Sequence, residues 1–287
     1  MVTPIRVAVV GHTEWIDFVR VPRVPVAGEI LHAFEAWSEP GGGGAVSARQ
    51  LARLAGSAAF FTALGNDELG KRMRRELTAL GVEVFASVGR EAQRRAIVFI
   101  DNAGERTITV LGTRLSPSAH DPLPWEQLAD VDAVYLTAGD PDAVRLARRA
   151  KVLVATSRVL PLLAEAGVEL DALVGSAADP SERYLDGDLP IRPRLVVRTR
   201  GRAGGTFQVA GGPEQPYAAA PLPGPVKDYY GCGDSFAAGL TFGLGLGYPP
   251  EHALGLAARC GAAVATGRGP YEGQPTMDQL SSTERRH

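Results

Sequence analysis

The chain has 287 residues and a formal net charge of −2, so it is long enough to bury a sizeable core and has no excess of basic residues. Hydrophobic residues make up 45% and charged residues 22%, as in a soluble globular protein, and the interspersed arginines argue against nucleic-acid binding. Two cysteines are too few for a disulfide framework and cannot by themselves complete a zinc site. The sequence shows neither a signal-peptide pattern nor an apolar run of about 18 residues, so we expect a cytoplasmic protein that does not bind membranes.

The first half of the chain alternates short apolar runs with segments of helical periodicity. The predicted elements are a strand at 6–11, a helix at 45–54, a strand at 58–64, a helix at 67–80 and a strand at 82–88. Two segments break this rhythm, at 15–37 and at 95–111, and the second folds back around a hairpin sequence, Asn102-Ala103-Gly104. We expect both to form a small sheet over one end of the main sheet, as a lid that excludes water.

The second half continues the alternation. The predicted elements are strands at 133–136, 152–155, 172–174 and 195–198, antiparallel strands at 204–209 and 215–220, and helices at 142–149, 159–166, near 180–184, 233–246 and 250–265. Alternation of this kind predicts an α/β fold, a doubly wound and mainly parallel sheet with helices on both faces. We expect one domain spanning residues 1–287, with a lid formed by segments at about 14–38 and 94–112.

The segment from Asp228 to Gly239, DYYGCGDSFAAG, carries the strongest chemical signal. Gly231, Cys232 and Gly233 precede a predicted helix, and the first N–H groups of a helix hold anions such as a transferring phosphoryl group. Asp234 falls in the first turn, where a carboxylate can take the proton of an attacking hydroxyl. Spacing alone leaves a second interpretation equally open, in which Asp234 only caps the helix.

This segment resembles the C-terminal signature D-T-x-G-A-G-D-x-F of the ribokinase-like (PfkB) carbohydrate kinases. Four further motifs resemble the family in the same order: the glycine signature at 41–54, G-x-D-x-x-G…L-x-x-x-G-V at 65–82, the G-E-R-T lid hairpin at 104–107 and the T-x-G-x-x-G loop at 199–204. The resemblance therefore covers nearly the whole chain. Neither a G-x-G-x-x-G after the first strand nor a G-x-x-x-x-G-K-S/T occurs, which argues against Rossmann dinucleotide binding and a Walker-type phosphate loop.

The resemblance implies a role for each residue that matches a family motif. The catalytic base would be Asp234, and the anion hole Gly231, Cys232 and Gly233. The acceptor would be bound by Glu14, Asp17, Gly42, Gly43 and Val46. The nucleotide would be bound by Ser176, Thr199, Gly201 and Gly204. Asp179 would hold Mg²⁺ through water, and the backbone carbonyl of Asp228 is a candidate ligand for a monovalent cation such as K⁺.

Several of these positions have a second interpretation. Val46 replaces a family Asn that contacts a sugar hydroxyl, so a packing role is favoured and the acceptor is expected to be less hydroxylated or bound in another register. The family motif N-x-x-E reads Ser176 to Asp179 here, and either residue alternatively caps the helix predicted near 180–184. Glu14 and Asp17 are alternatively solvated charges of the lid.

The resemblance implies an enzyme that uses ATP and Mg²⁺ to phosphorylate a hydroxyl, favoured as the hydroxymethyl group of a sugar. A nucleoside is the main alternative acceptor and requires an aromatic slot. Trp15, Phe18, Phe34 and Trp37 form either that slot, the core of the lid or a homodimer contact through the lid. A third interpretation is a non-catalytic sugar or nucleotide sensor, against which the intact Gly-Cys-Gly-Asp turn argues.

Overall fold

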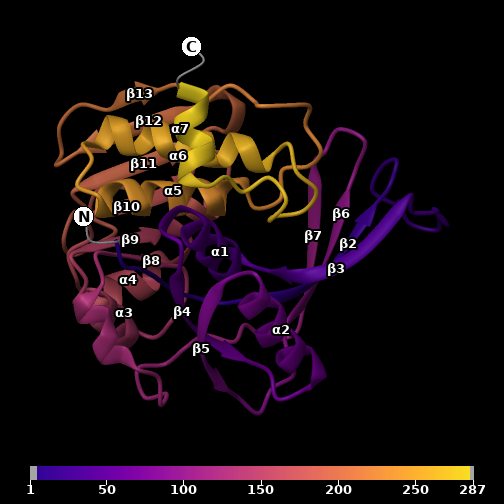
Figure 1. Ribbon diagram of the computed structural model, residues 1–287, viewed down its shortest axis with the longest axis horizontal. Coiled ribbons are helices and arrows are strands. Elements are labelled where there is room, and N and C mark those ends of the chain that lie inside the picture. The colour runs from indigo at the N-terminus through magenta and orange to yellow at the C-terminus, as the bar shows by residue number, and fades with distance from the viewer. Residues whose placement is uncertain (1–4, 285–287) are drawn as a thin grey trace.

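The computed structural model describes residues 5–284 and places their strands in two separate sheets (Figure 1). The main sheet has the order β13-β12-β11-β10-β9-β8-β1-β4-β5 and is parallel from β11 to β5, with β12 and β13 antiparallel at one edge. Its strands are β1 (Val7–Val10), β4 (Ala58–Leu64), β5 (Val82–Val88), β8 (Ala133–Leu136), β9 (Val152–Thr156), β10 (Ala172–Ser176), β11 (Leu195–Thr199), β12 (Gly205–Val209) and β13 (Gln215–Tyr217). The predicted mainly parallel sheet is confirmed.

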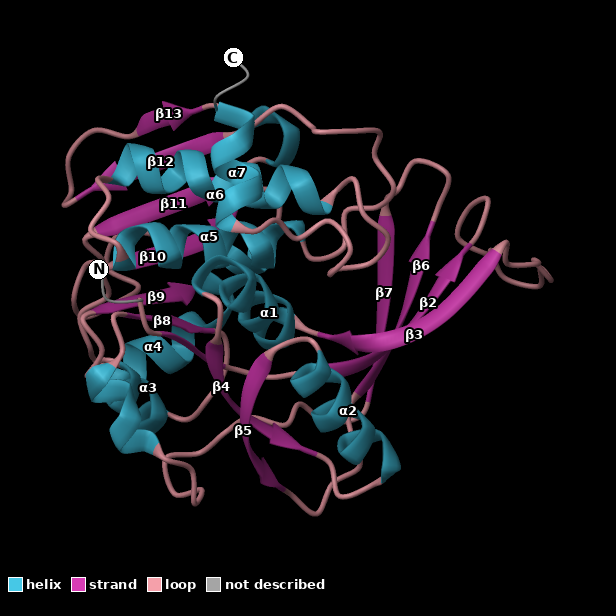
Figure 2. Ribbon diagram, in the orientation of Figure 1, coloured by secondary structure: helices cyan, strands magenta, loops and turns pink. Residues whose placement is uncertain are grey.

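Helices cover both faces of the main sheet (Figure 2). One face carries α1 (Gly43–Ala55), α2 (Glu68–Ala79), α5 (Cys232–Gly245), α6 (Pro250–Val264) and α7 (Met277–Glu284). The other carries α3 (Pro141–Ala147) and α4 (Leu160–Ala166). The alternation of β1 explains this layering, because Val7 and Val9 pack into the first core while Ala8 and Val10 pack into the second.

The strand order shows at which end of the main sheet a ligand would bind. β1 lies between β4 and β8, and it is parallel to both. The chain therefore winds outward from β1 in both directions, and a crevice opens at the carboxyl ends of the strands where the order reverses. Both α1 and α5 begin near this crevice, as their contacts described below show.

The second sheet is the predicted lid, with the order β3-β2-β6-β7. Its strands are β2 (Glu14–Arg20), β3 (Glu35–Gly41), β6 (Arg95–Ile100) and β7 (Arg106–Leu111). One apolar face of the lid, which includes Ile16, Phe18 and Val98, packs against Val46 and Tyr230 of the body. These contacts hold the lid over the starts of α1 and α5.

The structure differs from the sequence expectation at two places in the C-terminal half. The helix predicted near 180–184 is a single 3₁₀ turn, η3 (Pro180–Glu182), and the strand predicted at 215–220 stops at Tyr217. The helix α7 was not predicted, because its apolar residues are few and no glycine or proline marks its end. None of the helices within residues 5–284 is long and apolar enough to cross a membrane.

Candidate active site

The helix α5 begins at Cys232 with an uncapped N-terminus. Its N-cap residue, Gly231, has a φ of 81°, and no side chain caps the helix, so the first N–H groups have no intrahelical acceptor. Asp234 lies in the first turn and is partly exposed to the crevice. Burial raises the pKa of the Cys232 thiol to about 12, so the thiol stays protonated at neutral pH and only the backbone of this residue can serve an anion.

Two glycines of this turn differ in what surrounds them. A Cβ on Gly231 would lie 3.0 Å from Cβ of Pro270 and 3.1 Å from Cγ1 of Val46, and the positive φ further favours glycine. A Cβ on Gly233 would meet no atom within 4 Å, so the space above the helix start is open. Val46 is fully buried against this turn, which supports its interpretation as a packing residue.

The start of α1 lies directly beside Asp234. A Cβ on Gly43 would stand 3.0 Å from Oδ1 of Asp234, so a residue without a side chain lets the helix approach the carboxylate. Ser47 donates a hydrogen bond of 3.1 Å to the backbone oxygen of Asp234, and the N–H of Gly42 donates one of 3.0 Å to the hydroxyl of Tyr230. Two helix starts therefore converge on one carboxylate.

The environment of Asp234 raises its pKa to about 6, and burial is the main cause. The carboxylates of Glu182 and Glu14 raise it further, while Arg106 and Arg158 lower it. A carboxyl group with this pKa is about nine-tenths ionised at pH 7 and is a stronger base than an ordinary aspartate. Asp234 is thus suited to accept a proton near neutral pH.

Glu14 stands at the root of the lid, beside the crevice. It is 7% exposed, and its Oε1 lies 3.1 Å from Nε of Arg94 and 3.7 Å from Nε2 of His12. Burial raises the pKa of Glu14. For His12, burial lowers the pKa to about 3, and the positive charges of Arg114, Arg94 and Arg158 lower it further. His12 is therefore neutral at physiological pH.

Asp17, the other acidic residue expected to bind the acceptor, has different partners. Its carboxylate accepts hydrogen bonds from Ser38 at 2.6 Å and from Arg95 at 2.7 Å, both on neighbouring lid strands. Ile16 and Phe18 face the body, so Asp17 between them points to the opposite face of the sheet. The structure does not bring Asp17 to the carboxylate of Asp234.

The residues expected to bind the nucleotide gather at the ends of two adjacent strands. Ser176 ends β10 and is paired in register with Thr199, which ends β11. Gly201 and Gly204 follow in the next turn with φ values of 54° and 76°, and a Cβ on Gly204 would stand 2.2 Å from the backbone oxygen of Tyr217. These residues therefore lie together on the same edge of the sheet, as expected of a nucleotide loop.

The carboxylate near Asp234 on this side is Glu182 rather than Asp179. The Asp179 side chain caps η3 by accepting a hydrogen bond from the N–H of Ser181, which is the alternative role given to it in the sequence analysis. Glu182 accepts a hydrogen bond of 2.7 Å from the backbone N–H of Ser176 and forms an ion pair with Arg158, and its charge reaches Asp234. Sequence analysis missed Glu182 because it lies three positions after Asp179, the residue aligned with the glutamate of the family motif.

Asp228 is buried, and protein groups already use its carboxylate. The N–H groups of Tyr230 and Gly269 donate to its two oxygens at 3.0 and 2.9 Å. The Nη2 of Arg20, from the lid, lies 3.7 Å from Oδ2 of Asp228 and 3.4 Å from the backbone oxygen of Lys227. A guanidinium group thus supplies positive charge where the resemblance places a monovalent cation, so the residues present fit such a cation poorly.

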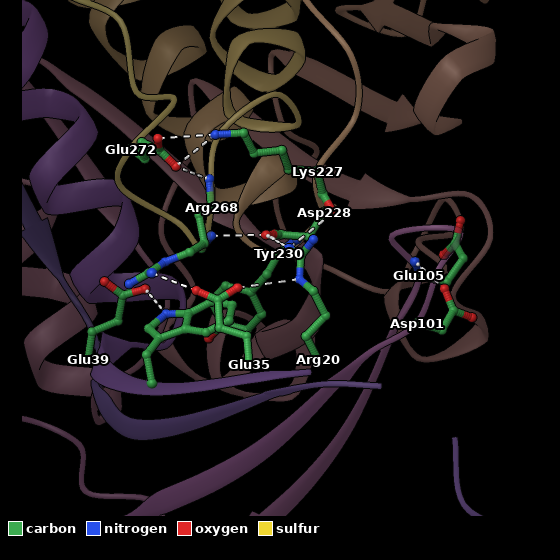
Figure 3. A network of polar contacts seen from close by, with 12 residues as sticks. Arg20, Glu35, Glu39, Asp101, Glu105, Lys227, Asp228, Tyr230, Arg268 and Glu272 are labelled. Carbon is green, nitrogen blue, oxygen red and sulfur yellow. Dashed lines mark hydrogen bonds and ion pairs between the residues drawn. The ribbon is translucent and has the colours of Figure 1, made fainter. Parts of the chain in front are cut away.

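Arg20 belongs to a network that joins the lid to the C-terminal loops (Figure 3). Glu35 lies 3.9 Å from Nε of Arg20 and 2.7 Å from Nη1 of Arg268, and Lys227 lies 3.1 Å from Glu272. A cavity of about 460 Å³ is lined by Arg20, Glu35, Glu39, Lys227, Arg268 and Glu272. Since these charges are paired with one another and Asp234 does not line the cavity, the network holds the lid in place rather than forming the reaction site.

Comparison with known sequences identifies the family of this chain. A sequence profile of the pfkB family carbohydrate kinases matches residues 5–167 and 166–277. The chain belongs to this family. It is therefore a carbohydrate kinase.

Individual pfkB proteins are similar over almost the whole chain. An ATP-dependent ribose-1-phosphate kinase from Halopiger xanaduensis is 29% identical, over 97% of both chains. A fructokinase from Klebsiella pneumoniae is 28% identical over 84% of this chain and 90% of its own.

Solved structures share the fold at lower identity. A putative ribokinase from Agrobacterium tumefaciens has a TM-score of 0.80 and 20% identity over 99% of this chain and 98% of its own. The Arabidopsis thaliana ribokinase complexed with ribose and ATP has a TM-score of 0.76 and 20% identity over 98% of both chains.

Four charged residues of this pfkB site were not assigned from the sequence. They are Arg94, Arg106, Arg114 and Glu182. Arg106 lies in the G-E-R-T motif, so a signal was present for it. The other three lie at strand ends or in turns that follow them, where only the fold shows that they approach the site.

Proposed function

We propose that the protein transfers the γ-phosphoryl group of ATP to the hydroxymethyl group of a sugar. The observation that carries this proposal is a carboxylate with a pKa raised to about 6 in the first turn of a helix whose N-terminus is uncapped. Such a helix start stabilises the negative charge of the transferring group, and the adjacent carboxylate takes the proton of the accepting hydroxyl.

In this mechanism each group has a separate task. The hydroxyl oxygen attacks phosphorus while its proton moves to Asp234, and the bond to the ADP oxygen breaks. The first N–H groups of α5, those of Cys232 and Gly233, have no side-chain cap and would bind the phosphoryl oxygens. Arg106, on β7 of the lid, is near enough to lower the pKa of Asp234 and adds positive charge at the same place. The lid excludes water, which limits hydrolysis of ATP.

Magnesium fits this site as a partner of the phosphates. No cluster of three or more His, Cys, Asp or Glu side chains in the described part of the chain forms a metal cage. Mg²⁺ commonly binds one or two carboxylates together with substrate phosphates and water. Glu182 would hold it, with Asp179 beyond, and the metal would neutralise charge on the phosphates.

Replacing Glu182 with glutamine is expected to raise the Mg²⁺ concentration for half-maximal activity by about 10-fold or more, since groups that orient a metal site typically contribute 10–100-fold in affinity. Glutamine keeps the size of the side chain and one oxygen for the N–H of Ser176. The measurement is initial rate against free Mg²⁺ at saturating ATP. Glu165→Gln, at an exposed position of α4, is the control. An unchanged Mg²⁺ requirement in Glu182→Gln would remove this residue from the metal site.

The aromatic residues of the lid favour a sugar over a nucleoside. Trp15 and Phe18 are 2% and 0% exposed, and Phe18 stacks on Trp37 with ring centroids 4.9 Å apart. The guanidinium group of Arg268 lies over the ring of Trp37, with its Cζ 4.6 Å from the ring centroid. Trp15 packs into the core of the main body, and Phe18 and Trp37 pack within the lid, so these three rings do not form a free slot for a base. Phe34, the fourth predicted ring, is 63% exposed and has no aromatic partner among the described residues.

A panel of acceptors tests the proposal. The protein is incubated with ATP, Mg²⁺ and ribose, fructose, ribose 1-phosphate, gluconate or adenosine, and the products are identified by mass spectrometry and ³¹P NMR. We expect a phosphate ester on a primary hydroxyl of at least one sugar or sugar derivative. Binding of sugar or ATP without any phosphorylated product would instead support a sensor on a kinase scaffold.

Two finer features belong to this proposal. A homodimer through the lid is supported by exposed apolar residues on the edge strand β7, namely Ile108, Val110 and Leu111. A cytoplasmic location is supported by two free cysteines, Cys232 and Cys260. Because Arg20 lies beside Asp228, we assign no step of the reaction to K⁺.

A further inference from the structure

Three arginines surround His12 at the end of the crevice formed by β1, β8 and the root of the lid. We call Arg94, Arg114 and Arg158 the arginine cluster. Arg94 directly precedes β6, Arg114 follows β7 and Arg158 follows β9. All three are near enough that their charges lower the pKa of His12, so they approach one point from three separate segments of the chain.

The arginine cluster is only partly neutralised. Arg94 contacts Glu14, with Nε 3.1 Å from Oε1, and Arg158 pairs with Glu182 and, at 3.0 Å, with Asp179. Arg114 forms no ion pair with any residue in the range 5–284, and it is more exposed than Arg94. Glu14 is the one acid whose charge acts on both Arg94 and Arg114 within the described residues, so the three guanidinium groups keep positive charge for a ligand.

Two buried polar atoms beside the arginine cluster lack partners within the described residues. They are Nδ1 of His12 and Oγ1 of Thr137, on residues only 8% and 4% exposed. Thr137 follows β8, and its Oγ1 fills the place where a Cβ on Gly11 would stand, at 2.1 Å. Because a buried polar group without a hydrogen bond is costly, these atoms indicate a place for hydroxyl groups of a bound molecule.

The geometry connects this place to the catalytic base. A Cβ on Gly43 would lie 3.7 Å from Cγ2 of Thr137 and 3.0 Å from Oδ1 of Asp234, so one small glycine separates the two. The charges that shift the pKa of Asp234 most are those of Arg106, Arg158, Glu182 and Glu14. Arg94 lies 3.1 Å from Glu14, which in turn lies 3.7 Å from His12, and the charges of Arg94 and Arg114 both act on His12.

We infer that the acceptor is a sugar monophosphate, whose existing phosphate is held by the arginine cluster while its hydroxymethyl group faces Asp234. This inference rests on the proposed function and names its substrate class. The reaction then converts a sugar monophosphate and ATP into a sugar bisphosphate and ADP. Val46, which cannot bond a sugar hydroxyl, agrees with an acceptor that is anchored by charge instead.

A phosphate fits the arginine cluster better than a carboxylate does. A phosphate monoester carries nearly two negative charges and three acceptor oxygens, and guanidinium groups bind it bidentately. A carboxylate offers one charge and two oxygens, which Arg114 alone would satisfy. The similarity to a ribose-1-phosphate kinase independently makes ribose 1-phosphate the appropriate probe.

The test compares kcat/KM for ribose 1-phosphate, ribose and gluconate in the wild-type protein and in Arg114→Gln. We expect the wild type to prefer ribose 1-phosphate to ribose by at least about 10-fold. Arg114→Gln should lower that preference about 10–100-fold, since a hydrogen bond to a charged group contributes about 1.5–3 kcal/mol. Arg149→Gln, an exposed arginine after α3, is the matched control and should keep the preference.

Calorimetric binding of ribose 1-phosphate and ribose to both variants separates the inference from the proposed function. Selective binding of ribose 1-phosphate that Arg114→Gln weakens, without turnover, would uphold the inference and contradict the kinase reaction. Phosphorylation of ribose or gluconate as efficiently as of ribose 1-phosphate would overturn the inference and leave the kinase function standing. An unchanged preference in Arg114→Gln, or no binding of ribose 1-phosphate, would overturn it as well.

Discussion

Replacing Asp234 with asparagine is expected to lower kcat by about 10²–10⁴-fold, the usual contribution of a general base. Asparagine keeps the size of the side chain but cannot accept the proton of the attacking hydroxyl. The melting temperature should stay the same or rise slightly. Burial raises the pKa of Asp234, so ionised Asp234 destabilises the folded state at neutral pH, and the substitution removes that charge.

The matched control for this variant is Asp142→Asn. Asp142 also lies in the first turn of a helix, α3, but it is exposed, and among residues 5–284 its one ion pair is with Arg145, at 2.5 Å. Loss of an exposed pair of this kind has little effect on stability, and we expect kcat to be unchanged. If Asp234→Asn retained wild-type turnover, the helix-capping interpretation of Asp234 would be the correct one.

Adding a single methyl group at Gly43 is expected to lower kcat by about 10²-fold, because small displacements of a reacting group have effects of this size. The new Cβ would stand 3.0 Å from Oδ1 of Asp234 and would displace the carboxylate. Gly43 is in the first turn of α1 and has a φ outside the left-handed region, so alanine suits the helix. Activity should therefore fall without a loss of melting temperature.

Gly255→Ala provides the comparison for this second variant. Gly255 lies within α6, and a Cβ there would meet no atom within 4 Å. We expect equal or higher stability and wild-type kinetics, since alanine is the better helix former. A Gly43→Ala protein as active as the Gly255→Ala protein would show that the approach of α1 does not position Asp234.

Much of the fold follows from local sequence. The apolar alternation of β1 and the caps of α2 are local features, and the predicted bounds of β4 match the observed ones. The glycine-rich turn before α5 is also local, so the sequence alone indicated this helix start and Asp234 as candidates for the site. The candidate base and most strands of the main sheet each lie within a short segment, and that is why the sequence alone can suggest them.

The acceptor side of the site could not be predicted in the same way. Arg94, Arg114 and Arg158 lie on three separate segments, and the fold brings together the start of β6 and the ends of β7 and β9. Asp17 matched the family spacing, yet strand alternation turns it to the other face of the lid. Glu182 replaces Asp179 near the base because the 3₁₀ turn η3 carries its side chain back toward Ser176.

The most direct measurement of the central assignment is the pH dependence of kcat/KM in the wild type and in Asp234→Asn. Asp234 must be ionised to accept the proton, and its pKa is raised to about 6. We therefore expect wild-type kcat/KM to be constant above neutral pH and to fall with decreasing pH through about 6. The residual activity of Asp234→Asn should lack this acid limb. An identical limb in the variant, or a flat wild-type profile between about pH 5 and 8, would show that a different group accepts the proton.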